Sequence, residues 1–300
     1  MNLKGGIKAV RAPFLTASII PVLVGSSIVV ANQGELSILY FLLTLIGVVC
    51  IQAGTNLAND YFDHKSGNDI INKNRSPFNG GSAALVEGLY KPVEIKQAFT
   101  AFFLLAIVIA AYLTAQVGWP VMLIALFGIF SGYYYSAPPI YLASRGLGEF
   151  FVGLNFGTLV VLGTYYVQTG SFSLEALYVS LPIALLISAV LMINQIPDYE
   201  ADKKVGKNNL VVRLGKARGA RLYVAMVAAA YILIWMGPFL GLMPFTAHIA
   251  LLPGILAVKG ARILLASYDN PRAMLPANAI TIKLHFLTGL LLALGHILGR

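Results

Sequence analysis

The sequence predicts an all-α integral membrane protein, on the basis of its apolar composition, its long apolar segments and the one-sided placement of its basic residues. Hydrophobic residues make up 58% of the 300 residues and charged residues only 11%, whereas about 25% of the residues of a typical soluble domain are charged. This composition excludes an ordinary soluble globular domain. A spanning helix needs about 20 apolar residues, so we expect residues 1–300 to form a single membrane-embedded unit.

Nine apolar segments follow one another along the chain, each long enough to cross a bilayer as a helix. They cover residues 13–31, 36–58, 95–115, 119–137, 148–168, 174–196, 219–237, 244–266 and 277–298. The first has the basic flank of a signal peptide, but its apolar stretch is about 18 residues long, has no clear cleavage site and is followed by further spans. We therefore interpret it as the first transmembrane helix.

The basic residues are predicted to lie on one side of the membrane. If the N-terminus is cytoplasmic, the connections on the other side fall near residues 32–35, 116–118, 169–173 and 237–245, and none of them contains Lys or Arg. Twenty of the 21 basic residues then lie on the cytoplasmic side, with Arg300 the exception. Because Lys and Arg in short loops resist translocation, this distribution predicts a multi-pass cell-membrane protein. It also accounts for the net charge of +9 without a nucleic-acid partner.

Acidic residues gather at the cytoplasmic ends of the second and sixth segments. Each stretch contains the pattern Asn-x-x-x-Asp-Tyr and a further aspartate on the same helical face. The residues are Asn56, Asp60 and Asp63 in the first stretch and Asn194, Asp198 and Asp202 in the second. Ionised side chains at the end of an apolar helix are costly and usually functional, so both stretches are candidate parts of an active site.

These oxygen-bearing side chains indicate a site for a divalent cation. Stacked carboxylates repel one another, and a hard cation can hold them together. Oxygen ligands without clustered His or Cys point to Mg²⁺, which shares one or two carboxylates with the phosphate oxygens of a substrate. Basic residues follow both stretches, so we expect a phosphate-bearing, anionic substrate. They are Lys65, Lys73 and Arg75 after the first stretch and Lys203, Lys204 and Lys207 after the second.

Less specific interpretations exist for single residues. One aspartate at a helix end can be a solvated loop residue neutralised by nearby lysines, but two copies of the same pattern argue against that interpretation. His64 is expected to be a hydrated loop residue and not a ligand. The single cysteine, Cys50, lies in an apolar segment and can form neither an internal disulfide nor a thiolate cluster.

The two acidic stretches also indicate an internal repeat. Asn56 and Asn194 are 138 residues apart (194 − 56) and end the second and sixth segments. An even number of spans returns the chain to the same face, so two four-helix halves would run in parallel, with the ninth helix appended. The repeat axis would place the two acidic stretches opposite each other across one cavity mouth.

The motifs resemble those of a known family. Asn59-Asp-Tyr-Phe-Asp63 with Gly67 and Asp69, and Asp198-Tyr-Glu-Ala-Asp202, are similar to the two aspartate-rich motifs of the UbiA superfamily of intramembrane aromatic prenyltransferases. The resemblance extends over nearly the whole chain and includes the stretches at 133–149 and 206–215. It is strongest to the 1,4-dihydroxy-2-naphthoate polyprenyltransferase branch of menaquinone synthesis.

The resemblance implies nine transmembrane helices in a ring around a lipid-facing cavity, with the active site on the cytoplasmic side. It also implies two Mg²⁺ ions, a polyprenyl diphosphate donor such as geranylgeranyl diphosphate, and an aromatic acceptor. The metal and diphosphate would be bound by Asn56, Asp60, Asp63, Asn194, Asp198 and Asp202, with the four aspartates as catalytic residues. Further candidate contacts for the diphosphate are Lys65, Arg75, Arg145 and Lys203. The allyl cation needs a nearby π-face, for which the candidates are Tyr133, Tyr134, Tyr135 or Phe156.

A membrane transporter is the alternative from another functional class, because it also combines many spans, a repeat and charged helix ends. It would be expected to carry charged residues or Gly and Pro breaks near the bilayer midplane, whereas these acids lie at one interface. A phosphotransferase acting on CDP-alcohols would also use Mg²⁺ and aspartates, but its Asp-Gly-x-x-Ala-Arg pattern is missing. The sequence alone fixes neither the length of the prenyl donor nor the identity of the acceptor.

Overall fold

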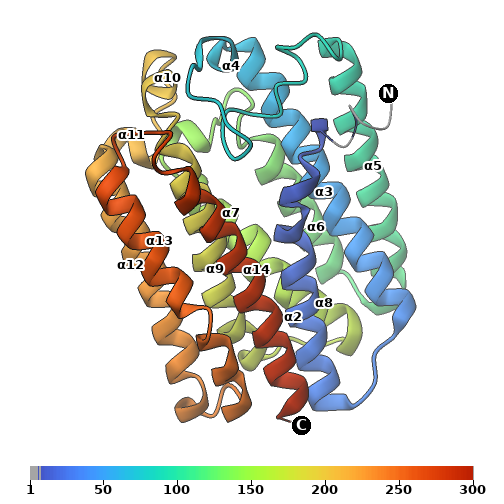
Figure 1. Ribbon diagram of the computed structural model, residues 1–300. Helices are drawn as coiled ribbons and strands as arrows, with labels where there is room; N and C mark the ends of the chain where they lie inside the picture. The colour runs from blue at the N-terminus through green and yellow to red at the C-terminus, as the bar shows by residue number, and fades with distance from the viewer. Residues whose placement is uncertain (1–5, 7, 300) are drawn as a thin grey trace.

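The computed structural model describes residues 6 and 8–299, and all regular structure within these residues is helical. Eight helical segments are long and apolar enough to cross a membrane. They are α2 (Thr16–Gln33), α3 (Ile38–Lys65), α5 (Pro92–Val117), α7 with η3 and α8 (Gly148–Thr169), α9 (Leu174–Gln195), α12 (Lys216–Met236), η5 with α13 (Phe245–Ser267) and α14 (Leu275–Leu298). Figure 1 shows them side by side in one bundle. The prediction of an all-α, multi-pass membrane protein is confirmed.

The ninth predicted segment, residues 119–137, forms the shorter helix α6 (Pro120–Tyr133). Its 14 residues span about 21 Å at 1.5 Å per residue, less than the roughly 30 Å thickness of the hydrocarbon core. The helix begins with Pro120 in its first turn and ends where the chain turns away after Tyr133. The predicted nine spans are therefore eight full-length helices and one short one among the described residues.

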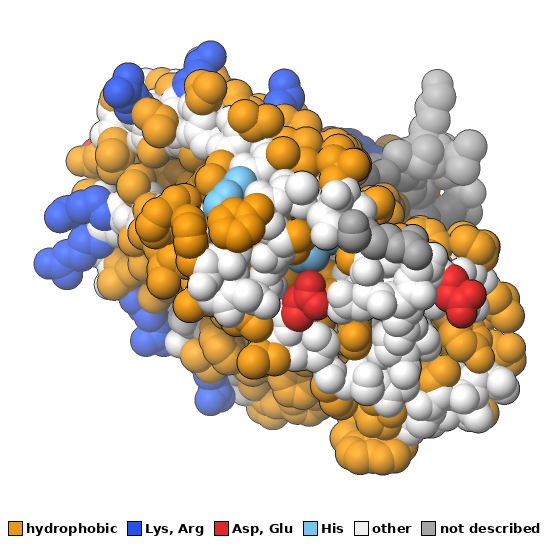
Figure 2. All heavy atoms as spheres, turned by 90° about the horizontal axis from the view of Figure 1, so that it is seen from below, with side chains coloured by type: hydrophobic (Ala, Val, Ile, Leu, Met, Phe, Trp, Pro, Cys, Tyr) orange, Lys and Arg blue, Asp and Glu red, His pale blue; other side chains and the backbone are white. Residues whose placement is uncertain are grey.

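Short helices cluster at one end of the bundle. They are α4 (Asn68–Ile71), α10 (Tyr199–Lys204) and α11 (Leu210–Leu214), which lie at the top of Figure 1. The opposite end is formed mainly by hydrophobic and uncharged side chains, and the basic ones seen from there lie at its margin (Figure 2). We call the end with the short helices the polar end; the opposite end is largely hydrophobic and uncharged but also carries acidic side chains (Figure 2).

The order of elements repeats along the chain, as the spacing of the motifs predicts. α3 ends in the first acidic stretch, continues into α4 and packs against the next long helix, α5. In the second half, α9 ends within the second acidic stretch, just after Asn194, is followed by α10 and packs against α12. α14 follows the second half and packs against both α2 and α9.

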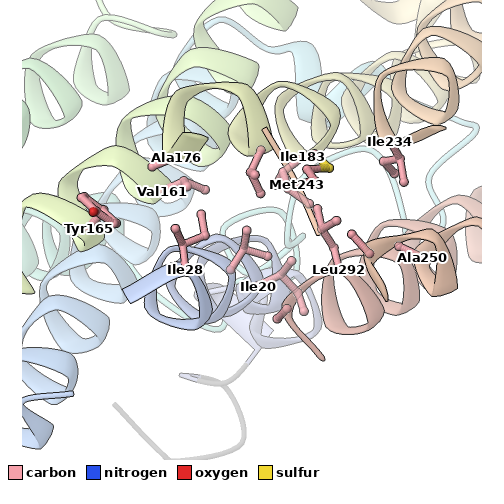
Figure 3. Packing of buried hydrophobic residues seen from close by; sticks show 14 of the residues in the cluster. Ile20, Ile28, Val161, Tyr165, Ala176, Ile183, Ile234, Met243, Ala250 and Leu292 are labelled. Carbon is pink, nitrogen blue, oxygen red and sulfur yellow. The ribbon is translucent and has the colours of Figure 1, made fainter. Parts of the chain in front are cut away.

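The core that holds the two halves together lies between α2, α8, α9 and α14. Ile20 and Ile28 of α2 pack with Val161, Ile183 and Leu292 (Figure 3). Glycines allow the close approach of these helices, because a Cβ at position 25 would lie 2.7 Å from the carbonyl oxygen of Val161. Small residues at helix contacts are typical of membrane proteins.

Candidate active site

The two acidic stretches, far apart in the sequence, line one cavity at the polar end of the bundle. This polar cavity has a volume of about 180 Å³. Of the predicted metal-binding residues, it is lined by Asn56, Asp63, Asn194, Asp198 and Asp202. Asp60 is buried beside it, behind the backbone of Gly81, where an added Cβ would lie 3.1 Å from Asp60 Oδ1.

The first stretch lies on the last turns of α3. Asp63 accepts hydrogen bonds from Asn59 at 3.0 Å and from the ammonium group of Lys207 at 2.8 Å. Both oxygens of Asp60 lie 3.2 Å from the backbone N–H of Ser82. Asn56 donates to the carbonyl oxygen of Val10. The spacing of these residues therefore places their side chains on one face of α3, but each side chain is hydrogen-bonded to a different group.

The second stretch begins with Asn194 in the last turn of α9 and continues into α10 after a turn at residues 196–198. Its three members therefore do not lie on one continuous helix as predicted, and most of the partners of Asp198 and Asp202 come from the first half of the chain. Asp198 accepts from Asn79 at 2.5 Å, from Asn72 at 2.6 Å and from the backbone N–H of Gly80 at 3.2 Å. Asp202 accepts from Asn68 at 2.8 Å and from Asn209 at 2.6 Å. These amides separate the carboxylates of one half from those of the other.

A loop at residues 72–82 carries several of these donors across the cavity. Gly80 and Gly81 have φ angles of +75° and +71°, a region that glycine adopts without a steric penalty. An added Cβ at Gly81 would lie 2.9 Å from Asp69 Oδ2 and 3.1 Å from Asp60 Oδ1. The two glycines let the backbone pass directly against the carboxylates.

The electrostatics of the cavity favour a bound cation. Burial, with Asp63 and Asp60 nearby, raises the pKa of Asp69 to about 8. Burial likewise raises the pKa of Asp202 to about 7, although Lys207 opposes the shift. Burial alone would lower the pKa of Lys207, but Asp63 and Asp202 outweigh it and raise that pKa. The basic side chains of the cavity therefore do not fully neutralise its buried carboxylates, and a bound cation would stabilise them.

The donor set fits a hard divalent cation. Among residues 6 and 8–299, no three His, Cys, Asp or Glu side chains converge in a ready-made cage. Aspartate and amide oxygens nevertheless line the cavity, and the buried Asn68 Oδ1 and Gln195 Oε1 have no hydrogen-bond partner. Mg²⁺ needs no all-protein cage, because it keeps waters and binds through one or two carboxylates and substrate phosphates.

The predicted substrate contacts fall in different places. Arg75 lies beside the cavity, where it donates to the Asp69 carbonyl oxygen at 2.6 Å. Lys65 and Arg145 line a separate cavity, described below. Lys203 is exposed, outside both cavities, with its Nζ 5.6 Å from the centre of the Tyr199 ring. Tyr133 packs against the rings of Phe62 and Phe99, away from the polar cavity.

Several lining residues were not among the predicted site residues. They include Arg11, Asn68, Asp69, Asn79 and Lys207. The sequence carried a signal for Asp69 and Lys207, which belong to the motif-like stretches, but it gave no reason to prefer Lys207 over its neighbours Lys203 and Lys204. Arg11 and Asn79 carried no such signal, because the folding of the loops alone brings them here.

An apolar chamber adjoins the polar cavity inside the bundle. It has a volume of about 100 Å³ and lies between α3, α5, α6 and the segment from η3 (Leu154–Leu159) to α8 (Val160–Thr169). Thr55 and Phe156 line both spaces, so the two are neighbours. Gly47, Gly128 and Gly163 also line the chamber and contribute no side chains that would fill it.

A membrane-embedded bundle with two carboxylate stretches around one cavity, next to an apolar chamber, defines an intramembrane enzyme for an anionic substrate with an apolar part. The sequence profile described as the UbiA prenyltransferase family matches residues 18–287. The chain belongs to this family, so it is a prenyltransferase, and the resemblance drawn from its motifs is confirmed. The transporter alternative is thereby excluded.

Relatives are similar over almost their whole length. The chain is 32% identical to a 1,4-dihydroxy-2-naphthoate octaprenyltransferase of Bacillus subtilis, with 95% of this chain and 89% of the relative covered. It is 29% identical to a 2-carboxy-1,4-naphthoquinone phytyltransferase of Synechocystis, with 97% and 92% covered.

Solved structures share the fold. A digeranylgeranylglyceryl phosphate synthase structure superposes with a TM-score of 0.65 at 22% identity, with 99% of this chain and 98% of that chain covered. A UbiA homologue from Archaeoglobus fulgidus bound to DMAPP and Mg²⁺ superposes with a TM-score of 0.61 at 18% identity, with 96% and 98% covered.

Proposed function

We propose that this protein transfers a polyprenyl group from an allylic polyprenyl diphosphate to an aromatic acceptor, 1,4-dihydroxy-2-naphthoate or a related quinone precursor, in a Mg²⁺-dependent reaction. The observation that carries this proposal is the junction of the polar cavity with the apolar chamber at Thr55 and Phe156. An allylic diphosphate has one highly charged end and one apolar end, and the two spaces match these ends. The names of the naphthoate-prenylating relatives support the choice of acceptor.

We assign the metal sites to the side chains of the two acidic stretches. The proposed ligands are Asn56, Asp60, Asp63, Asn194, Asp198 and Asp202, for two Mg²⁺ ions. The burial of Asp60, Asp63 and Asp202 supports this assignment, because buried carboxylates gain most from a nearby cation. When bound, Mg²⁺ neutralises the charge that develops on the leaving diphosphate.

The diphosphate is assigned to the basic side chains around the polar cavity. Lys207 and Arg11 line it directly, and Arg75 lies beside Asp69. Preorganised cations stabilise a leaving group whose negative charge grows in the transition state. These residues replace Lys65, Arg145 and Lys203 in the diphosphate role, because the latter lie outside this cavity.

The reaction follows from this arrangement. The bond between C1 of the donor and the diphosphate oxygen breaks, and its electron pair leaves with the diphosphate. The allyl cation is attacked by an electron-rich ring carbon of the acceptor, and the ring regains aromaticity by losing a proton, or carbon dioxide where the attacked carbon carries a carboxylate. The rings of Tyr135 and Phe156 line the cavity and can stabilise the cation while water is excluded.

We place this chemistry at the cytoplasmic face of the membrane. The short helices and both acidic stretches lie at one end of the bundle (Figure 1). The same end receives the Lys-rich and Arg-rich connections, which resist translocation.

A reconstituted assay tests the proposed function. The purified protein is incubated with Mg²⁺, geranylgeranyl diphosphate and a panel of aromatic acceptors that includes 1,4-dihydroxy-2-naphthoate, and the products are identified by mass. We expect a prenylated naphthalene product that is lost in excess EDTA and restored by added Mg²⁺. No prenylated product with any acceptor would refute the function, and undiminished transfer in EDTA would refute the metal requirement.

A further inference from the structure

A second cavity lies at the polar end of the protein, next to the donor site described above, and shares only Asp63 and Lys207 with the polar cavity. This outer cavity has a volume of about 560 Å³, within the range of about 300–1,000 Å³ typical of small-molecule sites. It is bounded by the end of α3, the turn η2 (Ala143–Arg145) and the segment after α10.

The charges around the outer cavity favour a small anion. Lys65, Arg145 and Lys207 line it, against the single carboxylate of Asp63. Lys65 and Arg145 are exposed at its rim, whereas Lys207 is bonded to Asp63 at 2.8 Å on the inner side. The two rim cations are therefore without a carboxylate partner in this cavity and can bind a carboxylate from solution.

The walls of the outer cavity favour an aromatic ring. Phe62, Pro138 and Tyr141 line it, and the Tyr141 side chain is 43% exposed. Such apolar and aromatic surfaces, with a few polar groups that set orientation, are typical of sites for small aromatic ligands. Inorganic diphosphate, the other small anion of this reaction, would gain nothing from these walls.

A thin partition of side chains separates the outer cavity from the polar cavity. Ser136 donates to Asn59 at 2.7 Å, Asn59 donates to Asp63 at 3.0 Å, and Lys207 donates to the same Asp63 oxygen at 2.8 Å. Asp63 and Lys207 line both cavities. This hydrogen-bonded row of side chains thus lies where the outer cavity and the donor site meet.

From this geometry we propose that the outer cavity receives the aromatic acceptor from the cytoplasm, with its carboxylate bound by Lys65 and Arg145 and its ring against Phe62 and Tyr141. The amphiphilic donor reaches its site separately, with its diphosphate in the polar cavity and its prenyl chain entering the apolar chamber. This inference rests on the proposed function, and it adds a site and a route for the second substrate.

Steady-state kinetics test the carboxylate contacts. In Lys65→Gln and Arg145→Gln, we expect the KM for 1,4-dihydroxy-2-naphthoate to rise about three- to tenfold, as for partly exposed charge pairs, and the KM for geranylgeranyl diphosphate to stay unchanged. With 1,4-dihydroxynaphthalene, which lacks the carboxylate, the variants and wild type should have equal KM values. Lys204→Gln, an exposed lysine outside the cavity, is the matched control.

An occupancy experiment distinguishes the acceptor from released diphosphate. A cysteine is placed at Ser144, which lines the outer cavity, in a Cys50→Ser background, and its rate of labelling by a thiol reagent is measured. We expect 1,4-dihydroxy-2-naphthoate to slow the labelling and inorganic diphosphate to leave it unchanged. Protection by diphosphate alone, or by neither, would overturn the proposal.

The outcomes also separate this inference from the proposed function. A wild-type enzyme that prenylates the acceptor, together with Lys65→Gln and Arg145→Gln variants of normal acceptor KM, would refute the outer cavity as the acceptor site and leave the function intact. A wild-type enzyme that prenylates no acceptor would refute the function itself.

Discussion

Asn68 donates a hydrogen bond of 2.8 Å to Asp202, across 134 residues of sequence, and this buried contact joins the segment after α3 to the segment after α9. Asn72 makes the equivalent contact to Asp198 at 2.6 Å. Amides of the first half thus satisfy carboxylates of the second half. The polar cavity is therefore assembled from both halves and depends on their packing.

The first prediction concerns the two acidic stretches as one catalytic unit. Asp60→Asn and Asp198→Asn should each lower prenyl transfer on the order of 10²-fold or more, because each removes a carboxylate proposed to hold the Mg²⁺ that stabilises the leaving group. Since residues that act as a unit are non-additive, the double variant should be scarcely slower than the worse single variant. Turnover and donor binding of folded, membrane-inserted protein measure this. Purely additive losses would indicate two separate sites.

The second prediction concerns the close approach of the loop to the carboxylates. Gly81→Ala should strongly reduce activity, because its Cβ would lie 2.9 Å from Asp69 Oδ2 and its φ of +71° disfavours a side chain. Gly88→Ala is the matched control, since its φ is +68° but nothing lies within 4 Å of an added Cβ. Both variants carry similar backbone strain, so an equal loss of activity would show that the contact with the carboxylates has no role.

The third prediction concerns pH and the stability of the metal-free protein. The pKa of Asp69 is raised to about 8 by burial and by Asp63 and Asp60, above the roughly 3.9 of an unfolded chain. The folded state therefore binds this proton more tightly, and the stability gained is fully present below about pH 4 and is lost as the pH rises towards 8.

Asp69→Asn cannot ionise, so in EDTA it should raise the melting temperature at pH 8.5 by a few degrees and change it less at pH 5. Thermal melts of purified protein in detergent at the two pH values measure this. If the variant has a lower melting temperature than wild type at pH 8.5, the ionised Asp69 carboxylate does not destabilise the folded protein.

The fourth prediction concerns the length of the prenyl donor. Gly128 lines the apolar chamber, and an added Cβ there would meet Ile51 at an ordinary 3.8 Å. Substitution by Ala, Val and Leu should fill the chamber step by step and shift the preference towards shorter donors. Competition between geranyl and geranylgeranyl diphosphate measures the shift.

Leu104→Phe on α5 is the control for this series, because Leu104 is 57% exposed on the outer surface of the bundle. Its donor preference should equal that of wild type. An unchanged preference across all three Gly128 variants would remove the chamber from the donor site.

The fifth prediction concerns orientation in the membrane. In a Cys50→Ser background, a cysteine at the exposed Lys73 should react with an impermeant thiol reagent from the cytoplasmic side, and one at the exposed Gln33 from the other side. The reason is that the connections expected on the other side, near residues 32–35, 116–118, 169–173 and 237–245, contain no Lys or Arg. Labelling of both positions from one side would contradict the proposed topology.

The sequence by itself determined the features that depend on local spacing and composition. The apolar segments predicted the membrane fold, because each is long enough to cross the bilayer as a helix and a helix satisfies its own backbone hydrogen bonds in lipid. The three- and four-residue spacing of Asn56, Asp60 and Asp63 determined that they share a face of α3. The two motifs were sufficient to indicate the family, since their residue types follow from the chemistry of the ligand.

The tertiary structure alone decided which side chains meet. Lys203 and Lys207 lie four residues apart, yet Lys203 faces solvent and Lys207 is bonded to Asp63. Lys65, next to the first motif, lines the outer cavity, whereas the more distant Asn79 reaches Asp198. The direction of each side chain depends on loop dihedrals such as the positive φ of Gly80 and Gly206 and on contacts over more than a hundred residues. Local sequence patterns encode neither these loop dihedrals nor these long-range contacts, because both are established only when the two halves pack together.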